Sequence, residues 1–363
     1  MRFKIAVLPG DGIGEEIIPE SVKVLNKIGS KFEHEFVLDY GNIGGNAIDS
    51  DGTPLPAETL KLCEDSDGIL FGAVGGPKWD DMNAKVRPED GILTLRKSME
   101  LFANLRPVKI FPALSSASPL KEELVKDVDM VILRELTGGL YFAQPKKRWV
   151  DDGQRHGIDT LQYSEFEISR ILRVGFELAK TRRSKLTSAD KANVLQTGRL
   201  WRELAIEISN DYPEVELDHI YVDNLAMQLI SQPGRFDVIV TENTFGDILS
   251  DEAGVLIGSL GMLPSASLAY SKDQSKQYRV GLYEPIHGSA PDIAGKSIAN
   301  PIGIILSAAL MLEYSFGLFK EAEAINQAVN NVLEMGYRSA DITSEKGKFV
   351  STSEMGDLVT ENI

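Results

Sequence analysis

Residues 238–252, with the sequence VIVTENTFGDILSDE, join a short apolar strand to a helix that carries two carboxylates. Val238 to Val240 has the continuous apolar character of a strand that is buried on both faces. In the segment that follows, Asp247 and Asp251 are four residues apart, so a helix places both side chains on one face. This strand-to-helix order predicts an α/β fold, in which ligands bind beyond the carboxyl ends of the strands.

The two aspartates of this helix are candidate metal ligands. Like charges at this spacing repel, and Gly246, Ile248 and Leu249 are expected to make the surroundings apolar. A cation would relieve the repulsion, and hard carboxylate oxygens suit Mg²⁺ or Mn²⁺. The alternative is a solvated acidic helix face, and this stretch alone does not decide between the two.

The same alternation of strands and helices runs along most of the chain. Strands are expected at residues 4–8, 68–71 and 129–133, an amphipathic helix at 15–28 and a buried helix at 302–312. Residues 138–164 do not fit and predict a long hairpin around Asp151-Asp152-Gly153. Such a hairpin either pairs with another subunit or lies exposed on the surface. No low-complexity linker is present, which suggests two interleaved domains.

Composition limits the partners. The formal net charge of −16 argues against nucleic acid and anionic membranes. Cys63 is the only cysteine, so no intrachain disulfide is possible and a reducing compartment such as the cytoplasm is expected. The longest apolar run, residues 302–312, is too short to span a membrane. An acidic protein that binds an acidic metabolite must gather positive charge locally, so its arginines are candidates for the binding site.

Two glycine-rich stretches resemble nucleotide-binding motifs and fail. In Gly10-Asp11-Gly12-Ile13-Gly14 the third glycine of the dinucleotide fingerprint would fall at Glu15. Glu15 and Glu16 also place negative charge at the helix amino end, where a pyrophosphate would bind. The stretch therefore predicts a tight turn. Gly295-Lys296-Ser297 imitates the end of a Walker A motif, but Ala290 stands where its first glycine belongs.

Three arginines in apolar settings, Arg96, Arg106 and Arg134, are candidates for binding a dicarboxylate. Guanidinium groups bind carboxylates in a bidentate, planar geometry that lysine cannot match. A single arginine of this kind is usually a surface residue lying over apolar neighbours. Three of them in so acidic a chain favour a dicarboxylate site.

Tyr141 and Lys191 are possible proton carriers, although each is equally an ordinary surface residue on these grounds. Lys191 is expected to precede an apolar strand, and desolvation near a metal would lower its pKa toward that of a general base. The glycine-rich loop at 284–296 precedes the buried helix and could wrap a nucleotide, with Asp292 accepting the hydroxyls of an adenosine ribose and repelling a 2′-phosphate. A helix-capping loop is the alternative.

Taken together, these residues resemble the β-decarboxylating dehydrogenases, the family of the isocitrate and isopropylmalate dehydrogenases, and within it the isopropylmalate branch. The resemblance runs nearly end to end. It is carried by LPGDGIGEEI, GAVGGPKWD, RPEDGILTLRKSMELFANLRPVK, LRELTGGLYF, DKANVL, YVDNLAMQL, NTFGDILSDEAG and EPIHGSAPDIAGKSIANP, in this order.

The resemblance implies the isocitrate/isopropylmalate dehydrogenase-like α/β fold, which is not a Rossmann fold. It implies a cofactor-binding domain of residues 1–101 and 258–363 that contains both termini. Residues 102–257 would form the substrate, metal and dimerisation domain, with a hairpin arm near 138–164. The active site would lie in a cleft between the domains and be completed by the second subunit of a homodimer.

The resemblance also implies a role for each candidate residue. Arg96, Arg106 and Arg134 would bind the carboxylates of the substrate, and Glu89, Ile92, Leu93 and Val194 would complete its pocket. Mg²⁺ or Mn²⁺ would bind Asp247 and Asp251 together with Asp223 of the partner chain. Lys191, also of the partner, would take the hydroxyl proton, and Tyr141 would protonate carbon after CO₂ leaves. NAD would bind at Gly75, Gly76, His287, Gly288, Ser289, Ala290, Asp292 and Asn300.

The implied reaction is the NAD-dependent oxidative decarboxylation of 3-isopropylmalate to 4-methyl-2-oxopentanoate in leucine biosynthesis. Burying a third carboxylate against Ile92 and Leu93 without partners would cost several kcal/mol, which disfavours isocitrate. Homoisocitrate, D-malate and tartrate dehydrogenases remain as alternatives, and so does a catalytically silent regulatory subunit. A metal hydrolase fits less well, because a histidine-rich site is missing and the nucleotide loop would go unused.

Overall fold

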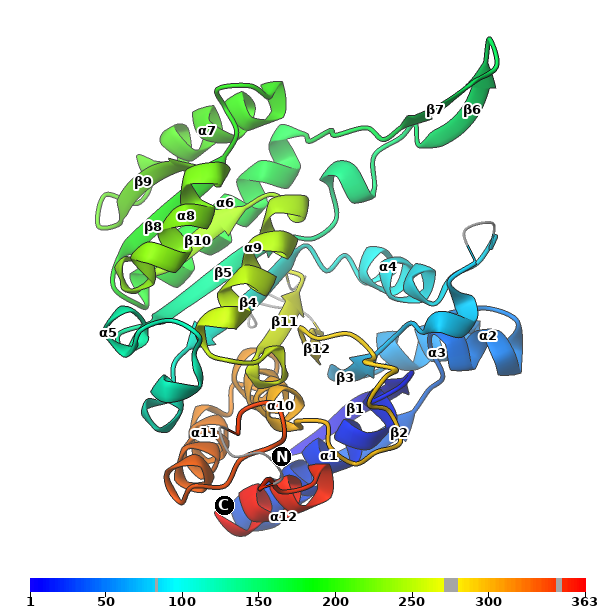
Figure 1. Cartoon of the computed structure of the whole chain (residues 1–363), viewed down its shortest axis with the longest axis vertical. Helices are drawn as coiled ribbons and strands as arrows, with labels where there is room; N and C mark the ends of the chain where they lie inside the picture. Colours follow the sequence, from blue (N-terminus) through cyan, green and yellow to red (C-terminus); the bar gives the residue numbers. More distant parts are fainter. Residues whose placement is uncertain (82–83, 271–279, 344–347) are drawn as a thin grey trace. The chain divides into compact units, whose positions relative to one another are not determined.

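The computed structural model describes residues 1–81, 84–270, 280–343 and 348–363. The chain forms two compact units (Figure 1). The terminal unit, which holds both chain ends, comprises Met1–Leu101, Ile110–Lys126 and Gly254–Ile363, and the central unit comprises Phe102–Lys109 and Asp127–Ala253. The predicted boundaries at 101 and 258 differ from this division, because residues 110–126 and 254–257 belong to the terminal unit. Arg338 holds part of the first segment there, donating from Nη2 to the carbonyl of Ala113 at 2.7 Å.

Among its described residues, the terminal unit contains five strands in the order β2-β1-β3-β12-β11. Their bounds are Glu35–Tyr40, Arg2–Gly10, Gly68–Ala73, Leu282–Pro285 and Pro264–Leu268. β1 pairs in parallel with β2 and β3, β3 pairs in parallel with β12, and β11 runs antiparallel to β12. The predicted strands at 4–8 and 68–71 are therefore confirmed as the cores of β1 and β3.

Both faces of these strands are covered, which explains their continuous apolar sequence. Ile5, Ala6, Val7 and Leu8 of β1 are all fully buried. Alternate side chains point to opposite faces. One set packs in a core that also contains Cys63 and residues of the helix α4 (Pro88–Ser98). The helices α1 (Gly14–Phe32) and α10 (Ile302–Tyr314) pack against the sheet as well.

The helices of the terminal unit connect and cover these strands. The α-helices are α1 (Gly14–Phe32), α2 (Gly45–Asp51), α3 (Ala57–Glu64), α4 (Pro88–Ser98), α5 (Glu122–Val125), α10 (Ile302–Tyr314), α11 (Phe319–Glu334) and α12 (Thr352–Glu361). The short 3₁₀ helices are η1 (Pro77–Trp79), η2 (Pro112–Ala117) and η5 (Leu260–Met262). α1 and α10 confirm the predicted amphipathic and buried helices.

The central unit contains five strands in the order β4-β5-β10-β8-β9. Their bounds are Ala103–Lys109, Asp129–Glu135, Val238–Thr241, Lys185–Asp190 and Glu216–Tyr221. β4 is antiparallel to β5, whereas β10 pairs in parallel with β5 and β8, and β8 with β9. The register aligns Thr241 with Arg134 on one side and Ala189 on the other. The residues that follow β5, β8 and β10 therefore meet at one edge of the sheet.

Helices join the strands of the central unit. They are α6 (Glu165–Lys180), α7 (Gln196–Ser209), α8 (Val222–Ser231) and most of α9 (Asn243–Leu256), with the 3₁₀ turns η3 (Gly139–Tyr141) and η4 (Pro233–Arg235). α6 begins at a capping box, in which Ser164 and Glu167 satisfy each other's backbone N–H groups. This cap fixes the chain direction directly after Tyr163, a residue on which the site depends.

The predicted hairpin is confirmed. β6 (Lys147–Asp151) and β7 (Gln154–Ile158) form a separate two-stranded antiparallel sheet that extends away from the rest of its unit (Figure 1). Every residue of both strands is exposed, including Val150 at 68%. An isolated hairpin is marginally stable in water. Trp149 stacks on His156 across the strands, with ring centroids 5.1 Å apart.

Across the described ranges, the model contains no helix that is both long enough and apolar enough to cross a membrane.

Candidate functional site

The edge at which β5 and β10 end holds an arginine bound to two side chains of α9. Arg134, only 4% exposed, donates from Nε to Asn243 Oδ1 at 2.9 Å and from Nη1 to Asp247 Oδ1. Gly246 makes this approach possible, because a Cβ there would lie 2.7 Å from the Cβ and Cγ of Arg134. The predicted apolar surroundings of Asp247 are only partly present. Leu249 is buried, but Ile248 is 62% exposed, since the two point to different sides of the helix.

The neighbouring strand adds a second guanidinium to this cluster. Arg106 of β4 is 6% exposed and is oriented by Asn104, which accepts from its Nε at 2.7 Å. Its Nη1 donates to Ser250 and lies 3.5 Å from Asp247 Oδ1 and 3.9 Å from Asp251 Oδ1. Asp247 and Asp251 therefore share one helix face, as predicted, and their mutual repulsion is offset by arginine.

Tyr141 completes the cluster. Its hydroxyl donates to Asp247 Oδ2 at 3.1 Å, and its ring lies 5.7 Å from the guanidinium carbon of Arg134. Burial, reinforced by the negative charge of Asp247, raises the pKa of Tyr141. Burial also raises the pKa of Asp251, while Arg106 acts in the opposite direction. The phenol is thus held protonated beside a carboxylate, which suits a proton donor.

A buried network behind this cluster fixes the turn that carries Tyr141. Tyr163 accepts a hydrogen bond from the backbone N–H of Asn243 at 3.0 Å. Its hydroxyl lies 3.2 Å from Glu135 Oε2 and 3.4 Å from Glu242 Oε2. Burial raises the pKa of both carboxyl groups. One phenolic proton serves only one carboxylate at a time, so Glu135 and Glu242 share the hydroxyl of Tyr163 as a donor.

The ring of Tyr163 also explains two glycines in the turn. A Cβ on Gly138 would lie 2.6 Å from the ring and one on Gly139 2.5 Å from its hydroxyl. Gly139 in addition has a φ of 72°, which favours glycine. Glu135 accepts a hydrogen bond from the N–H of Gly138 at 2.8 Å, and the side-chain amide of Asn243 donates to the carbonyl of Gly138 at 3.1 Å. The LTGGLY segment is therefore closely held against the carboxyl ends of β5 and β10.

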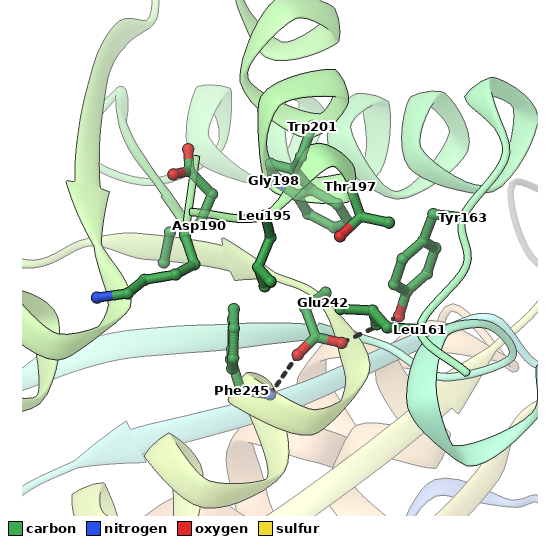
Figure 2. Close-up of a pocket in the computed structure, with 11 residues that line it drawn as sticks. Leu161, Tyr163, Asp190, Leu195, Thr197, Gly198, Trp201, Glu242 and Phe245 are labelled. Carbon is green, nitrogen blue, oxygen red and sulfur yellow. Dashed lines mark hydrogen bonds between the residues drawn. The ribbon is translucent and has the colours of Figure 1, made fainter. Parts of the chain in front are cut away.

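Glu242 and Tyr163 also line a small pocket beneath the residues that follow β8 (Figure 2). Its volume of ≈ 10 Å³ holds about one water molecule. Trp201, Leu195 and Phe245 supply most of the apolar wall around it. The pocket is too small for a substrate and is better described as part of the packing below the site.

Lys191 lies directly after β8, where it forms an ion pair with Asp223. The predicted strand after Lys191 is wrong, because residues 191–195 form a turn that leads into α7. The apolar residues of this segment instead face the small pocket or solvent, as Leu195 and the 63% exposed Val194 do. Lys191 Nζ lies 2.5 Å from Asp223 Oδ1 on α8, and this contact lowers the pKa of Asp223.

In the terminal unit, the opening turn is a tight turn as predicted. Gly10 and Gly12 have φ values of 73° and 57°. Between them, the carboxylate of Asp11 is buried and accepts hydrogen bonds from the backbone N–H groups of Gly45, Asn46 and Gly75, each at 2.8 Å. The turn therefore organises the loop that holds the predicted cofactor residues Gly75 and Gly76.

The predicted cofactor loop after β12 contains both open and buried groups. Asp292 and Gly288 are exposed, and a Cβ on Gly288 would meet nothing within 4 Å. His287 Nδ1 lies 2.8 Å from the carbonyl oxygen of Gly288, while its buried Nε2 finds no hydrogen-bond partner among the described residues. Burial lowers the pKa of His287.

Asn300, also predicted to bind cofactor, makes hydrogen bonds within the terminal unit. It accepts from the N–H of Ile302 at 3.0 Å, at the start of α10, and donates to Asp341 at 3.1 Å. Asn300 lies beyond the predicted loop of residues 284–296, and the N-cap residue of α10 is Pro301, which makes no side-chain cap.

The residues predicted on α4 have different environments. Ile92 is 6% exposed and belongs to the core of the terminal unit, whereas Leu93 is half-buried and Glu89 is exposed. Arg96 Nη2 donates to Glu284 Oε1 at 2.7 Å. Its buried Nε has no hydrogen-bond partner among the described residues. A guanidinium with an unused, buried donor suits a carboxylate ligand.

These side chains fit the groups that the sequence implies. Asp247 and Asp251 offer hard oxygen donors on one face, which is the chemistry that Mg²⁺ or Mn²⁺ prefers. The described residues of one chain bring together no set of three or more His, Cys, Asp or Glu side chains that could hold an ion. The unsatisfied Nε2 of His287 beside an open glycine loop fits a polar ligand such as a dinucleotide.

Sequence reasoning missed the residues that support the site. Glu135, Asn104 and Asn243 lie in segments that carry the family resemblance, but no role was predicted for them, and Tyr163 lies outside these segments. A signal existed for Glu135 and Asn243, because Glu135 is the last residue of a buried strand and Asn243 lies two residues beyond the end of another. No comparable signal marks Tyr163, which precedes a helix in a segment that was read only as a hairpin.

The comparisons with known proteins agree with this architecture. Residues 4–359 match the family described as isocitrate/isopropylmalate dehydrogenase. The crystal structure of isocitrate dehydrogenase from Methylococcus capsulatus is 34% identical, with a TM-score of 0.86 and 99% of each chain covered. The chain belongs to the isocitrate/isopropylmalate dehydrogenase family and is an oxidoreductase. The predicted fold class is confirmed.

Among curated relatives, the chain is similar to two bacterial 3-isopropylmalate dehydrogenases. The protein from Geobacillus kaustophilus is 59% identical, covering 98% of this chain and 94% of the relative. The protein from Aquifex aeolicus is 56% identical, covering 100% of this chain and 97% of the relative. The resemblance predicted from the eight sequence segments is confirmed.

The buried network yields a prediction about stability. Tyr163→Phe should destabilise the protein by roughly 2–4 kcal/mol, because it leaves two buried carboxyl groups and the N–H of Asn243 without the hydroxyl. Tyr40, which is 60% exposed, offers a matched control. Urea unfolding should show a lower midpoint for Tyr163→Phe and no change for Tyr40→Phe. Equal midpoints would mean that the network does not stabilise the fold.

Proposed function

We propose that this chain catalyses the NAD-dependent oxidative decarboxylation of 3-isopropylmalate to 4-methyl-2-oxopentanoate and CO₂, a reaction of leucine biosynthesis. The observation that carries the proposal is the placement of Asp247 against Arg134, Arg106 and Tyr141. Two guanidinium groups, two carboxylates and one protonated phenol match a reaction that binds a dianion and returns a proton to carbon. The relatives with 56–59% identity carry the same activity in their names.

Charge balance suggests how the cluster accepts its ligands. Arg106 and Arg134 are almost fully buried and pair with the aspartates of α9. Leaving a buried charge without a partner would cost several kcal/mol. When the substrate binds, its carboxylates would take over the two arginines and a divalent ion would take over the aspartates. The two ligands together keep every charge paired, so each favours binding of the other.

The remaining ligands follow from the same assignments. A divalent ion would bind Asp247 and Asp251 together with Asp223 of a second copy, and NAD would bind the terminal unit at residues 75–76 and 287–300. When bound, the ion polarises the oxygen on C2 and NAD⁺ accepts the hydride from that carbon. Tyr141 holds the proton that returns to carbon after CO₂ departs. Arg96, with its unused Nε, would bind a carboxylate of the substrate.

Lys191 and Asp223 are proposed to act in the site of a second copy of the chain. They form one ion pair and Val194 beside them is 63% exposed, so the pair is presented at the surface of the central unit. Met227 on α8 and Ile248 on α9 are each 62% exposed, and the hairpin strands β6 and β7 pair only with each other and are exposed along their whole length. Exposed apolar side chains of this kind favour a subunit interface. A cytoplasmic homodimer is the proposed form.

The choice of substrate rests on α4. Leu93 is the apolar residue of the predicted wall that is not fully buried, whereas Ile92 contributes to the core. An apolar wall suits an isopropyl group. Homoisocitrate, D-malate and tartrate are the competing substrates. An NADH-absorbance assay of 3-isopropylmalate against these three, with and without Mg²⁺, tests the proposal. If one of the competing substrates is turned over faster than 3-isopropylmalate with Mg²⁺, that compound is the substrate and the proposal is wrong.

Cofactor choice should rest on Asp292. Because its exposed carboxylate would repel a 2′-phosphate, kcat/KM should be much higher with NAD⁺ than with NADP⁺. Asp292→Ser should narrow the difference, mainly by improving NADP⁺. Glu58, an exposed acid on α3, serves as the control, and Glu58→Ser should leave the ratio unchanged. Similar kcat/KM values for the two cofactors in the unmodified protein would contradict the role of Asp292.

Tyr141 and Lys191 should act in one site but come from different chains. Tyr141→Phe and Lys191→Ala should each be nearly inactive as homodimers. After the two are unfolded and refolded together in equal amounts, half of the dimers should be mixed. In a mixed dimer one site carries both changes and the other carries neither, so about a quarter of the unmodified activity should return.

The control for this experiment is each variant refolded alone, which should recover nothing. If both residues came from the same chain, every site would carry one change. Mixed dimers detected by mass spectrometry with only single-variant activity would therefore rule out the shared site.

A further inference from the structure

Glu16, in the first turn of α1, is bound to the predicted cofactor loop. Its Oε1 accepts a hydrogen bond from the backbone N–H of Gly295, and its Oε2 accepts from the N–H of Ser297 at 3.0 Å. These two amides lie 279 and 281 residues further along the chain. Both oxygens of one carboxylate are thus used on one side of the loop, which is a charge-assisted contact stronger than a neutral hydrogen bond.

The same turn holds the other side of the loop. The N–H of Ile13 donates to the carbonyl of Ser289 at 2.9 Å. Gly12 allows this approach, because a Cβ there would lie 2.2 Å from the same carbonyl oxygen. Residue 289 is therefore hydrogen-bonded to the turn between β1 and α1, and residues 295 and 297 to the first turn of α1. Asp292 lies between these two attachments.

The loop has a conformation that needs such support. Ala290 and Ser297 have φ values of 39° and 52°, in the left-handed region that residues other than glycine seldom adopt. Backbone of this kind persists where surrounding contacts fix it. The attachments at Ser289 and Ser297 lie next to, or at, the two strained residues. The carbonyl of Ser297 also accepts from the N–H of Thr352 at 3.0 Å.

We propose that Glu16 is a positioning residue for the dinucleotide: by holding the amides of Gly295 and Ser297, it fixes the loop that presents His287 and Asp292 to the cofactor. This inference rests on the proposed function of that loop. It gives a role to the glycine-rich turn that lacks the spacing of a phosphate-binding motif. The turn and the Glu16 carboxylate that follows it hold the loop proposed to bind the nucleotide. They do not bind the nucleotide themselves.

The sign of the effect separates this role from simple electrostatics. A dinucleotide is an anion, so removing a nearby negative charge should by itself strengthen its binding. If Glu16 positions the loop, removing its charge should weaken binding instead. Glu15, the adjacent residue, is the matched control, because it carries the same charge but accepts from Asn46 and, among the described residues, makes no hydrogen bond or ion pair with the loop.

The experiment compares Glu16→Gln, Glu16→Ala and Glu15→Gln in the full-length protein. Glu16→Gln keeps one acceptor oxygen but turns an amide NH₂ toward a backbone N–H, so it loses one hydrogen bond, whereas Glu16→Ala loses both. KM for NAD⁺ should rise about threefold or more in Glu16→Gln and further in Glu16→Ala. The value of kcat at saturating NAD⁺ and KM for 3-isopropylmalate should stay within about twofold. Glu15→Gln should leave KM for NAD⁺ unchanged or lower.

Two further measurements keep the result interpretable. Hydrogen exchange of peptides that cover residues 289–297 should become faster in both Glu16 variants without any cofactor present. Thermal unfolding shows whether each variant is folded. If Glu16→Ala does not fold, KM for NAD⁺ in Glu16→Gln decides whether the positioning role holds. An unmodified protein that does not use NAD⁺ would refute the proposed function, and exchange would still test the attachment. Normal NAD⁺ turnover in the unmodified protein, with an equal or lower KM in a folded Glu16→Gln, would overturn the positioning role.

Discussion

The ion pairs of Asp247 with Arg134 and Arg106 are the interaction on which the site depends. Both guanidinium groups are nearly fully buried, and a buried charge without a partner would cost several kcal/mol. The sheet brings them together through strand order, since β4 and β5 are neighbours and β10 leads directly into α9. The register that places Asn104 opposite Arg134 also places Asn243 beyond the end of the adjacent strand. Each amide then orients one arginine.

The second constraint is the support behind these charges. Tyr163, Glu135 and Glu242 fill the space where three chain segments meet, and two glycines let the turn of Tyr141 approach them. In the terminal unit, Asp11 and Glu16 perform a similar task with backbone amides of the predicted cofactor loops. In both units a carboxylate that takes no part in the proposed chemistry organises a loop that does. Some acidic residues near the site therefore hold loops in place. These structural carboxylates make up part of the chain's negative charge.

Local sequence predicted several of the elements that form the core and the site. The buried strands, α1, α10, the hairpin and the shared face of Asp247 and Asp251 all follow from periodicity and turn residues, and all are present. The strand predicted after Lys191 was wrong because a short segment with three apolar residues, Ala192, Val194 and Leu195, is equally consistent with a strand and with a turn that packs against a pocket. The units divide differently near residue 110, because packing against α11 and Arg338 is a tertiary effect. Tyr163 could not be predicted, since its partners become neighbours only after the strands pair.

In the proposed mechanism the dianionic substrate and the divalent ion replace the resting ion pairs around Asp247, the substrate at the arginines and the ion at the aspartates, so that each ligand favours binding of the other. Titration of the protein with Mn²⁺, followed by electron paramagnetic resonance of the free ion, tests this directly when it is done with and without saturating 3-isopropylmalate and in the absence of NAD⁺. Mn²⁺ should bind about tenfold more tightly with the substrate present, because the arginines are then drawn from the aspartates. Equal Mn²⁺ affinity in the two titrations would mean that the substrate and the ion do not favour each other's binding, and would contradict this mechanism.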